Sequence, residues 1–303
     1  MSMIGTIIAL LVVMAAFGAI TNMKGSTPAG PIETGQYKNE DYKVPPADIR
    51  PPKLPIPETY GEARQWMQKN PIYDQKVPVP VRCEAKPLDL TKASRQQLQT
   101  HFDNLTGCLM RVWGPSLDNA GYTAVRPTVT IYRGQINSPC GKLPDRNAAY
   151  CAADQQVYYA ENLPTIIPNK LRSTNFVVDS IIAHEFSHAI QARTGILISQ
   201  AAWQQRSPKS TALEISRRTE AQADCWAAQF LQSVGKSVNL TQNDVQNIGQ
   251  LFYSIGDDQL TGDPNIVGNH GRGNTRISWY NKGITNADMG VCNSYIAPAS
   301  EVK

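Results

Sequence analysis

Charged residues and histidines are both scarce in this sequence. Charged residues make up only 18% of its 303 residues, the net charge is +4, and there are four histidines. No block of lysine and arginine stands out, so the chain is not expected to bind nucleic acid. An apolar share of 41% is enough for a sizeable core and excludes a wholly disordered chain. The length suggests about two domains, or one large domain with appendages.

The N-terminus lacks charge altogether until Lys24. As a helix, residues 3–20 would be roughly 27 Å long, close to the hydrocarbon thickness of a bilayer. An uncleaved membrane anchor is favoured over a cleaved signal peptide for two reasons. No basic residue precedes the run, and its possible cleavage site matches the A-x-A-like pattern poorly. A buried core helix is a third alternative. We therefore expect residues 1–23 to be a membrane anchor or signal segment.

Prolines are concentrated directly after this run, with eight between Thr27 and Pro57. Such a segment favours extended geometry and cannot bury much apolar surface. The sequence predicts an extended linker over residues 24–80, a globular domain over 81–297 and a short tail over 298–303. The linker would hold the domain away from a membrane.

No two cysteines form a C-x-x-C pair, which argues against paired zinc knuckles and thioredoxin-type chemistry. All six lie beyond the uncharged run. Three disulfides in an oxidising space outside the cytoplasm fit this distribution, and six buried free thiols in a cytosolic enzyme are the alternative. Local spacing favours Cys140–Cys151 over any other single pair. The candidates are Cys83, Cys108, Cys140, Cys151, Cys225 and Cys292.

Hydrophobic periodicity predicts helices over residues 94–110 and 175–193. Thr174 or Asn175 can cap the second of these helices, and Gly195 closes it. A polar connection is expected next, followed by a helix that starts with a capping pattern at residues 211–214 and runs to about residue 235. A similar cap begins a further helix at Thr241.

β-Branched and aromatic residues predict strands at residues 128–132 and, after a turn, within 150–159. His101 lies on the polar face of the first helix and is expected at the surface. The predicted fold class is α+β, with a mainly helical core and a small β-sheet.

Two of the four histidines belong to an H-E-x-x-H pattern, His184-Glu185-Phe186-Ser187-His188. Residues i and i+4 share a helix face, so both imidazoles can reach one metal ion. Glu185 lies beside them and can take a proton from a metal-activated water. The pattern lies in the middle of a predicted helix, the context it requires.

A catalytic zinc site takes three protein ligands and leaves one position open. The next helix offers Glu220 and Asp224, which are again four residues apart on one face. We expect Glu220 to be the third ligand and Asp224 to orient a ligating histidine through its other ring nitrogen. The alternative is that both carboxylates form a solvated helix edge.

The fourth histidine, His270, lies in a glycine-flanked segment after the predicted metal helices. Catalytic zinc sites often include a donor that stabilises the oxyanion formed during hydrolysis. His270 is the leading candidate for this catalytic role, ahead of Tyr253, Arg272 and Arg276. A loop histidine bonded to the backbone is the alternative.

In their order along the chain, these features resemble the putative neutral zinc metallopeptidase family, a group of bacterial, membrane-anchored, zincin-like proteins. The resemblance spans roughly residues 139–292. It is carried by P-C-G at 139–141, Y-C-A-A-D-Q-Q-V-Y at 150–158, A-H-E-F-S-H-A-I-Q at 183–191, E-A-Q-A-D-C at 220–225, I-G-D-D at 255–258, and H-G at 270–271 followed by Arg276 and Trp279.

The resemblance implies zinc bound at His184, His188 and Glu220, Glu185 as the catalytic carboxylate, and a Cys140–Cys151 bridge. The chain departs from the family pattern at Ser187, where members usually have glycine. It also departs at residues 272–274, where an Arg-Gly-Asn segment replaces a run through serines.

The sequence therefore predicts a zincin-like zinc metallopeptidase that hydrolyses a peptide or protein substrate. It would be membrane-anchored and extracytoplasmic, or secreted if the first segment is cleaved. The strand near residues 157–159 is expected to form the cleft edge along which an extended substrate pairs. The alternative is a catalytically idle binding or scaffold module that keeps this fold, although a purely structural zinc site has no need of Glu185.

Overall fold

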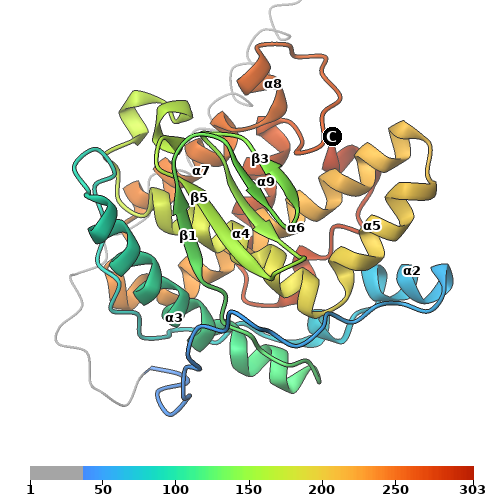
Figure 1. Cartoon of the computed structure of the whole chain (residues 1–303), viewed down its shortest axis with the longest axis horizontal. Coiled ribbons are helices and arrows are strands. Elements are labelled where there is room, and N and C mark those ends of the chain that lie inside the picture. Colours follow the sequence, from blue (N-terminus) through green and yellow to red (C-terminus); the bar gives the residue numbers. More distant parts are fainter. Residues whose placement is uncertain (1–36) are drawn as a thin grey trace, which may run out of the picture. The chain divides into compact units, whose positions relative to one another are not determined.

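The computed structural model describes residues 37–303, so the predicted anchor or signal segment, residues 1–23, lies outside the described range. Among residues 37–303, no helix combines the length and the hydropathy needed to cross a bilayer. In chain order, the helices and strands are α2 (Tyr60–Gln68), η2 (Pro71–Asp74), α3 (Arg95–Asn119), β1 (Val129–Tyr132), β2 (Ile136–Ser138), β3 (Gly141–Leu143), β4 (Ala148–Cys151), β5 (Gln156–Ala160), η3 (Leu163–Ile166), η4 (Asn169–Leu171), α4 (Val177–Arg193), α5 (Ile196–Arg206), α6 (Lys209–Val238), α7 (Gln242–Ser254), α8 (Asp257–Thr261), α9 (Gly273–Ile284), η5 (Met289–Cys292) and η6 (Ala299–Val302). The α+β class with a mainly helical core is confirmed (Figure 1).

The strands form a three-stranded sheet and a separate hairpin. The sheet has the order β1-β5-β4, with β1 parallel and β4 antiparallel to β5. Strands β2 and β3 pair only with each other. The predicted strand at 128–132 is confirmed as β1, whereas the 150–159 segment holds the end of β4, a turn and most of β5. In this order β5 is the central strand, and β4 is an edge strand because it pairs with β5 alone among the described strands.

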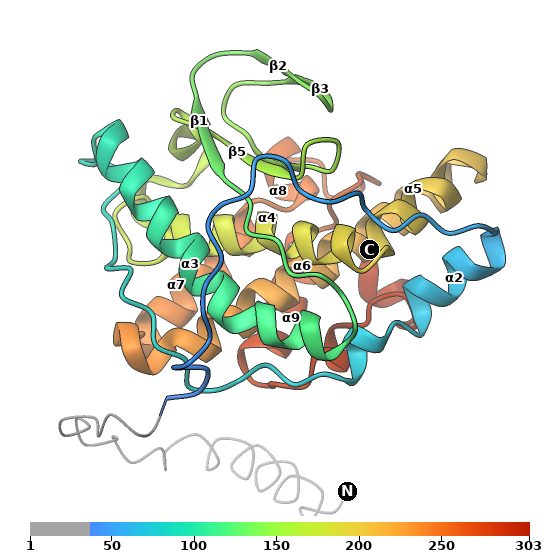
Figure 2. The ribbon, with the colours of Figure 1, turned by 60° about the horizontal axis from the view of Figure 1, so that its bottom comes forward.

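Helix α4 lies at the centre of the described fold. It packs between the sheet, through β4, and helix α6, and Figure 2 shows the strands on one side of α4 with α6 and α9 on the other. Large apolar side chains such as Phe186 are fully buried there. The helix predicted over 175–193 is thus confirmed, but its predicted cap is wrong. Phe176, with φ of 63°, is the N-cap residue, and no side chain caps the helix.

The segment after Gly195 differs from the predicted polar connection, because it forms helix α5. Gly195 separates α4 from α5 with φ of 76°, and a β-carbon there would lie 2.4 Å from the Trp66 ring. Helix α6 begins after Pro208, so the capping pattern at 211–214 lies inside it. The predicted cap at Thr241 is confirmed, since Thr241 and Asp244 form a capping box at the start of α7.

Helices α6 and α9 approach each other very closely. A β-carbon at Gly283 of α9 would lie 2.0 Å from the carbonyl oxygen of Cys225 on α6, so only glycine fits. Trp226 and Trp279 are fully buried in the same part of the core. This contact holds α9 against the helix that carries Glu220 and Asp224.

Residues 37–80 form part of the globular unit, which contradicts the predicted linker over this range. The stretch 43–59 has neither helix nor strand, as its prolines favour. Proline carbonyls still accept hydrogen bonds, however, and Pro52 accepts from both Gln155 and Arg193. Helix α2 and η2 follow, with Met67 and Ile72 buried in the core.

Two smaller expectations also differ from the structure. Residues 298–303, predicted as a tail, include η6 and the fully buried Val302, and the Trp279 indole donates to the carbonyl of Glu301 over 2.7 Å. His101, predicted at the surface, is buried because α3 packs against the start of α4. Its Nε2 lies 3.3 Å from Oδ1 of Asp179.

The six cysteines form three disulfides. They are Cys83–Cys108, Cys140–Cys151 and Cys225–Cys292, so the local pair favoured from spacing is confirmed. The first ties the segment after η2 to α3, the second ties the β2–β3 hairpin to the end of β4, and the third ties α6 to η5.

Candidate metal centre

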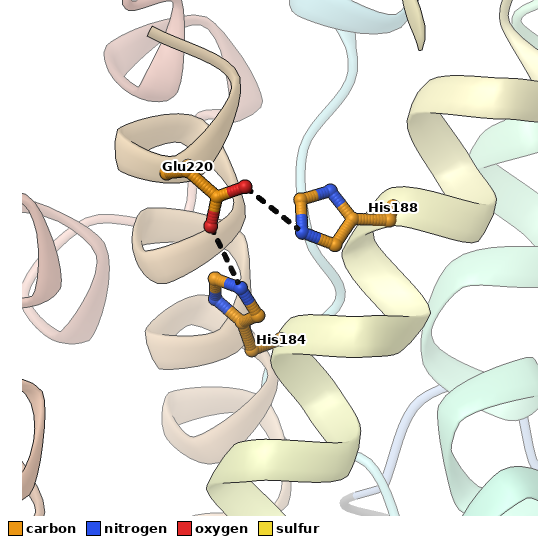
Figure 3. Close-up of side chains that lie close together, drawn as sticks. All are labelled: His184, His188 and Glu220. Atoms are coloured by element: carbon orange, nitrogen blue, oxygen red, sulfur yellow. Dashed lines mark ion pairs between the residues drawn. The ribbon is translucent and has the colours of Figure 1, made fainter. Parts of the chain in front are cut away.

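His184, His188 and Glu220 come together at the contact between α4 and α6 (Figure 3). The two histidines are one helical turn apart on α4, and their rings meet edge to face with centroids 4.8 Å apart. Glu220 reaches across from α6. Its Oε2 lies 3.3 Å from Nε2 of His184, and its Oε1 lies 3.7 Å from Nε2 of His188. One ligand atom from each residue lies within 4.8 Å of the other two.

This arrangement fits a zinc ion. A tetrahedral ion with bonds of about 2.0–2.1 Å separates its ligand atoms by about 3.3 Å. The separation between His184 Nε2 and Glu220 Oε2 has this value, and the other separations need only small side-chain adjustments. Two imidazole nitrogens and one carboxylate oxygen are also the donor set of thermolysin-type sites.

Asp224 lies behind His184, one turn after Glu220. Its Oδ1 is 2.8 Å from Nδ1 of His184, and the carboxylate accepts two hydrogen bonds from Arg276 of α9, of 2.8 and 2.9 Å. The Asp224 side chain is fully buried and that of Arg276 is 5% exposed. The carboxylate is therefore held rigidly against the ring nitrogen that faces away from the proposed metal position.

Glu185 belongs to the same helix and faces the edge strand. Its Oε2 accepts a 2.8 Å hydrogen bond from the backbone N–H of Tyr150 in β4. The backbone N–H of Ala160 in β5 donates to the carbonyl of Asn147, the residue before β4. In an antiparallel pair the hydrogen-bonded positions alternate, so the backbone groups of residues 148 and 150 point away from β5. The expectation that β5 forms the cleft edge is therefore wrong: β5 is central, and β4 borders the site.

Comparison with known proteins identifies the group to which these features belong. A family model described as "Putative neutral zinc metallopeptidase" matches residues 77–295. This chain belongs to that family.

Two curated relatives of this zinc metallopeptidase family member carry no functional description. The uncharacterized protein YpfJ of Escherichia coli (strain K12) is 29% identical over 190 residues, which cover 60% of this chain and 66% of YpfJ. The uncharacterized protein Mb2605 of Mycobacterium bovis is 28% identical over 204 residues, which cover 61% of this chain and 67% of the relative. The match to YpfJ thus spans just under two thirds of that protein's length. No solved structure matches significantly.

Ser187 stands where the resemblance to the family leads us to expect glycine. The side chain is fully buried, and its hydroxyl donates to the carbonyl of Ala183 over 2.8 Å. A hydroxyl on a helix can satisfy itself in this way on the preceding turn. The substitution therefore leaves no unpaired polar group at the packed face of α4.

A cavity of about 490 Å³ opens onto the cluster. Residues Ala148 to Tyr150 of β4 line the cavity, and so do the proposed ligands and Glu185. Aliphatic and aromatic side chains make up much of the remaining wall, among them Ile181, Leu197 and Phe252. The three proposed ligand side chains are thus only 9–14% exposed, and a molecule that enters the cavity can reach them.

His270 lines the same cavity and is held by Asp257. The Asp257 carboxylate accepts from the backbone N–H of His270 and of Gly271, and its Oδ1 lies 3.3 Å from Nδ1 of the His270 ring. The His270 side chain is 47% exposed. The Arg-Gly-Asn segment that departs from the family pattern contains the N-cap of α9, where the Gly273 N–H donates to Asp258.

The weaker candidates for the oxyanion donor lie elsewhere or are occupied. Arg276 lines the cavity but is committed to Asp224, as described above. Arg272 is the N-cap residue of α9 and lines a separate, smaller cavity. Tyr253 does not line the cavity at the cluster. His270 is the one of the four that combines access to the cavity with an uncommitted ring nitrogen, Nε2, among the described contacts.

The protonation of the cluster is set by opposing effects. Burial lowers the pKa of His184, but Asp224 and Glu220 outweigh it and raise that pKa to about 10. Burial raises the pKa of Glu220, but His188 and His184 outweigh it and the net pKa is well below its usual range. In the metal-free protein, a proton on His184 thus compensates the carboxylates.

Sequence reasoning missed three residues that contact this site. Tyr150 acts through its backbone N–H, which no side-chain pattern reveals. Asp257, the partner of His270, belongs to the I-G-D-D block, but its spacing to His270 carries no known motif. Gln191 lies 2.8 Å from Nδ1 of His188 through its Oε1. Its position three residues after His188, on the same helix face, could have suggested this contact.

Proposed function

We propose that this protein is a zinc-dependent peptidase with Glu185 as the general base. The observation that carries the proposal is the meeting of His184, His188 and Glu220 at one point of the cavity, with Glu185 beside them. When bound there, zinc supplies a Lewis acid that polarises a peptide carbonyl and acidifies water. The family membership supports the same proposal.

The proposed ligands come from two helices, and His184 has a charged partner behind it. Asp224, clamped by Arg276, holds the ring of His184 with Nε2 facing the cavity. Glu220 reaches the same point from α6. Support of this kind orients ligands and raises metal affinity.

Glu185 moves the protons of the reaction. It accepts a proton from the water whose oxygen forms the new bond to the peptide carbon. It then delivers that proton to the nitrogen as the carbon–nitrogen bond breaks, so the products are a carboxylic acid and an amine. The Tyr150 N–H holds the carboxylate at the cavity edge before the substrate enters.

The free edge of β4 offers the binding site for the substrate backbone. Residues 148 and 150 direct their N–H and C=O groups away from β5, toward the cavity. An extended peptide that added to this edge would lie across Glu185 and the metal ligands. We propose His270 as the donor to the oxyanion, since its exposed ring lines the same cavity.

The proposed location is the cell envelope or the exterior. The three disulfides support an oxidising compartment. Attachment to a membrane through residues 1–23 is part of this proposal and rests on the sequence.

The test is a peptide-library digest with the purified protein. We expect cleavage that a chelator abolishes and that added zinc restores. The Glu185→Gln variant should bind zinc as the wild type does but lose about 10²–10⁴-fold in rate, because it lacks the general base. A wild type that holds zinc and cleaves no member of the library would instead identify a binding or scaffold module.

A further inference from the structure

Among residues 37–303, no carboxylate pairs with Nδ1 of His188, in contrast to His184. Its Nδ1 lies 2.8 Å from the amide oxygen of Gln191, one turn further along α4. A hydrogen bond at this distance has two possible directions, because either ring nitrogen of a neutral histidine can carry the proton. The direction depends on whether the Gln191 amide presents its oxygen or its nitrogen to the ring.

The surroundings of Gln191 fix the orientation of its amide. Nε2 of Gln191 donates to the backbone carbonyl of Thr219 over 2.9 Å and to Oε1 of Gln222 over 3.0 Å. An amide nitrogen has two hydrogens, and both are used. The flipped amide would place its oxygen against two acceptors, and Gln191 is fully buried, so no water could relieve them.

The Gln222 amide is fixed in the same way. Its Nε2 donates to the hydroxyl of Tyr73 over 3.0 Å and to the carbonyl of Cys292 over 3.3 Å, which leaves its oxygen for Gln191. The Tyr73 hydroxyl in turn donates to the carbonyl of Met67 over 2.8 Å. Backbone carbonyls can only accept, so the carbonyls of Thr219, Cys292 and Met67 set the direction of the whole chain of hydrogen bonds.

We infer that Gln191 is a positioning residue that keeps the proton of neutral His188 on Nδ1 and its Nε2 free to bind a metal ion. This inference rests on the proposed metal site. A neutral amide thus does for His188 what the clamped carboxylate of Asp224 does for His184. Tyr73 and Met67 precede residue 77, where the family match begins, so part of the N-terminal segment helps to orient a ligand.

The first experiment uses the metal-free wild-type protein and needs no variant. Nitrogen-15 NMR of the imidazole rings, in alkaline buffer, shows which nitrogen of His188 carries the proton. We expect Nδ1–H. A His188 ring protonated on Nε2 would overturn the inference.

The second experiment compares zinc affinity among variants by competition with a chelator. Gln191→Met removes the acceptor and should weaken zinc binding about 10–100-fold. Gln191→Glu keeps an acceptor beside Nδ1 and should recover part of that loss. The control is Gln229→Met, which removes a different fully buried amide. Gln229 lies on α6, donates to the backbone carbonyls of Asn286 and Asp288, and is outside this chain of hydrogen bonds.

If Gln191→Met does not fold, Gln222→Met tests the same chain one step further from the ring. It should weaken zinc binding less than tenfold, because the Thr219 carbonyl still accepts from the Gln191 amide nitrogen and disfavours the flipped amide. Zinc binding by the Gln191 or Gln222 variants as tight as that of Gln229→Met would overturn the inference. A protein that cleaves no peptide but shows Nδ1–H and these affinities would contradict the proposed peptidase function and leave the role of Gln191 intact.

Discussion

The two walls of the cavity are built in different ways. The wall formed by α6 and α9 interlocks charged side chains out of water: Asp224 is fully buried, and Arg276 binds it through two hydrogen bonds. The other part of the lining, β4 and the segment around His270, uses backbone N–H groups and a half-exposed ring. Both parts border the same three proposed metal ligands.

The difference suggests a division of labour. Side chains that bind a metal ion need one fixed geometry. The buried Asp224–Arg276 ion pair and the hydrogen-bonded amides of Gln191 and Gln222 impose it. Groups that meet a substrate must exchange partners as the peptide enters, and an edge strand and an exposed histidine can do so. Changes to the α6–α9 wall should therefore affect stability and metal binding, and changes to the β4–His270 side should affect only the reaction.

The largest effect is expected from Arg276→Met. It leaves the Asp224 carboxylate buried without its guanidinium partner, and breaking such a pair costs about 3–5 kcal/mol. Denaturant unfolding of the metal-free protein measures this loss. The control is Arg133→Met, which removes an exposed partner of Glu161 and should change stability by about 1 kcal/mol at most. Equal effects of the two variants would contradict the account of this wall.

His270→Ala should leave zinc binding intact and slow the reaction. Removing one donor to a developing oxyanion costs about 10²–10³-fold in rate. Zinc affinity should change much less than the rate, because the ion-pair partner of the ring is Asp257. The rate and the affinity, measured on the same preparation, separate the two sides of the cavity. If this variant lost zinc, the proposed separation between metal-binding residues and residues that act only in the reaction would be wrong.

Zinc affinity should rise with pH. The pKa of His184 is about 10 in the metal-free protein, so binding must displace its proton below that pH. Apparent affinity is expected to increase about tenfold per pH unit between pH 7 and 9. Chelator competition at several pH values measures it, and a flat profile would contradict the prediction.

The same pKa predicts an opposite trend for the stability of the metal-free fold. The pKa of an unfolded histidine is about 6.5, so the raised value in the fold stabilises the protein fully below that pH. This stabilisation is lost as the pH rises through about 10. Unfolding of the zinc-free protein between pH 6 and 10 checks the sign.

The same contrast explains what the sequence could predict. Helical i, i+4 spacing relates His184 to His188 and Glu220 to Asp224. One sequence pattern on each of two helices was therefore enough to predict that these residues share a site. The β4 side depends on strand pairing over longer separations. Residues 150–159 contain the end of β4 and most of β5, and β5 also pairs with β1, so β4 is the edge strand. The sequence pattern did not show this pairing, and so it did not predict the hydrogen bond from the Tyr150 N–H to Glu185.

The fold was least predictable where polar or proline-rich sequence packs through backbone groups. The segment 196–206, expected as a polar connection, forms helix α5, and its Trp203 ring packs edge to face against Tyr60 of α2. The proline stretch offers carbonyls that Gln155 and Arg193 bind, which composition alone does not show. In both cases, tertiary contacts outweighed the local pattern.

The central claim is that His184, His188 and Glu220 together bind one zinc ion. Zinc content per chain, measured with X-ray absorption at the zinc edge on wild type, Glu220→Ala and the control Glu214→Ala, tests it most directly. The account predicts one zinc with two imidazole ligands in the wild type and in Glu214→Ala, and more than about 100-fold weaker binding in Glu220→Ala, because a direct ligand outweighs a supporting one. A wild type that binds no zinc, or a Glu220→Ala variant that binds it as tightly, would contradict the account.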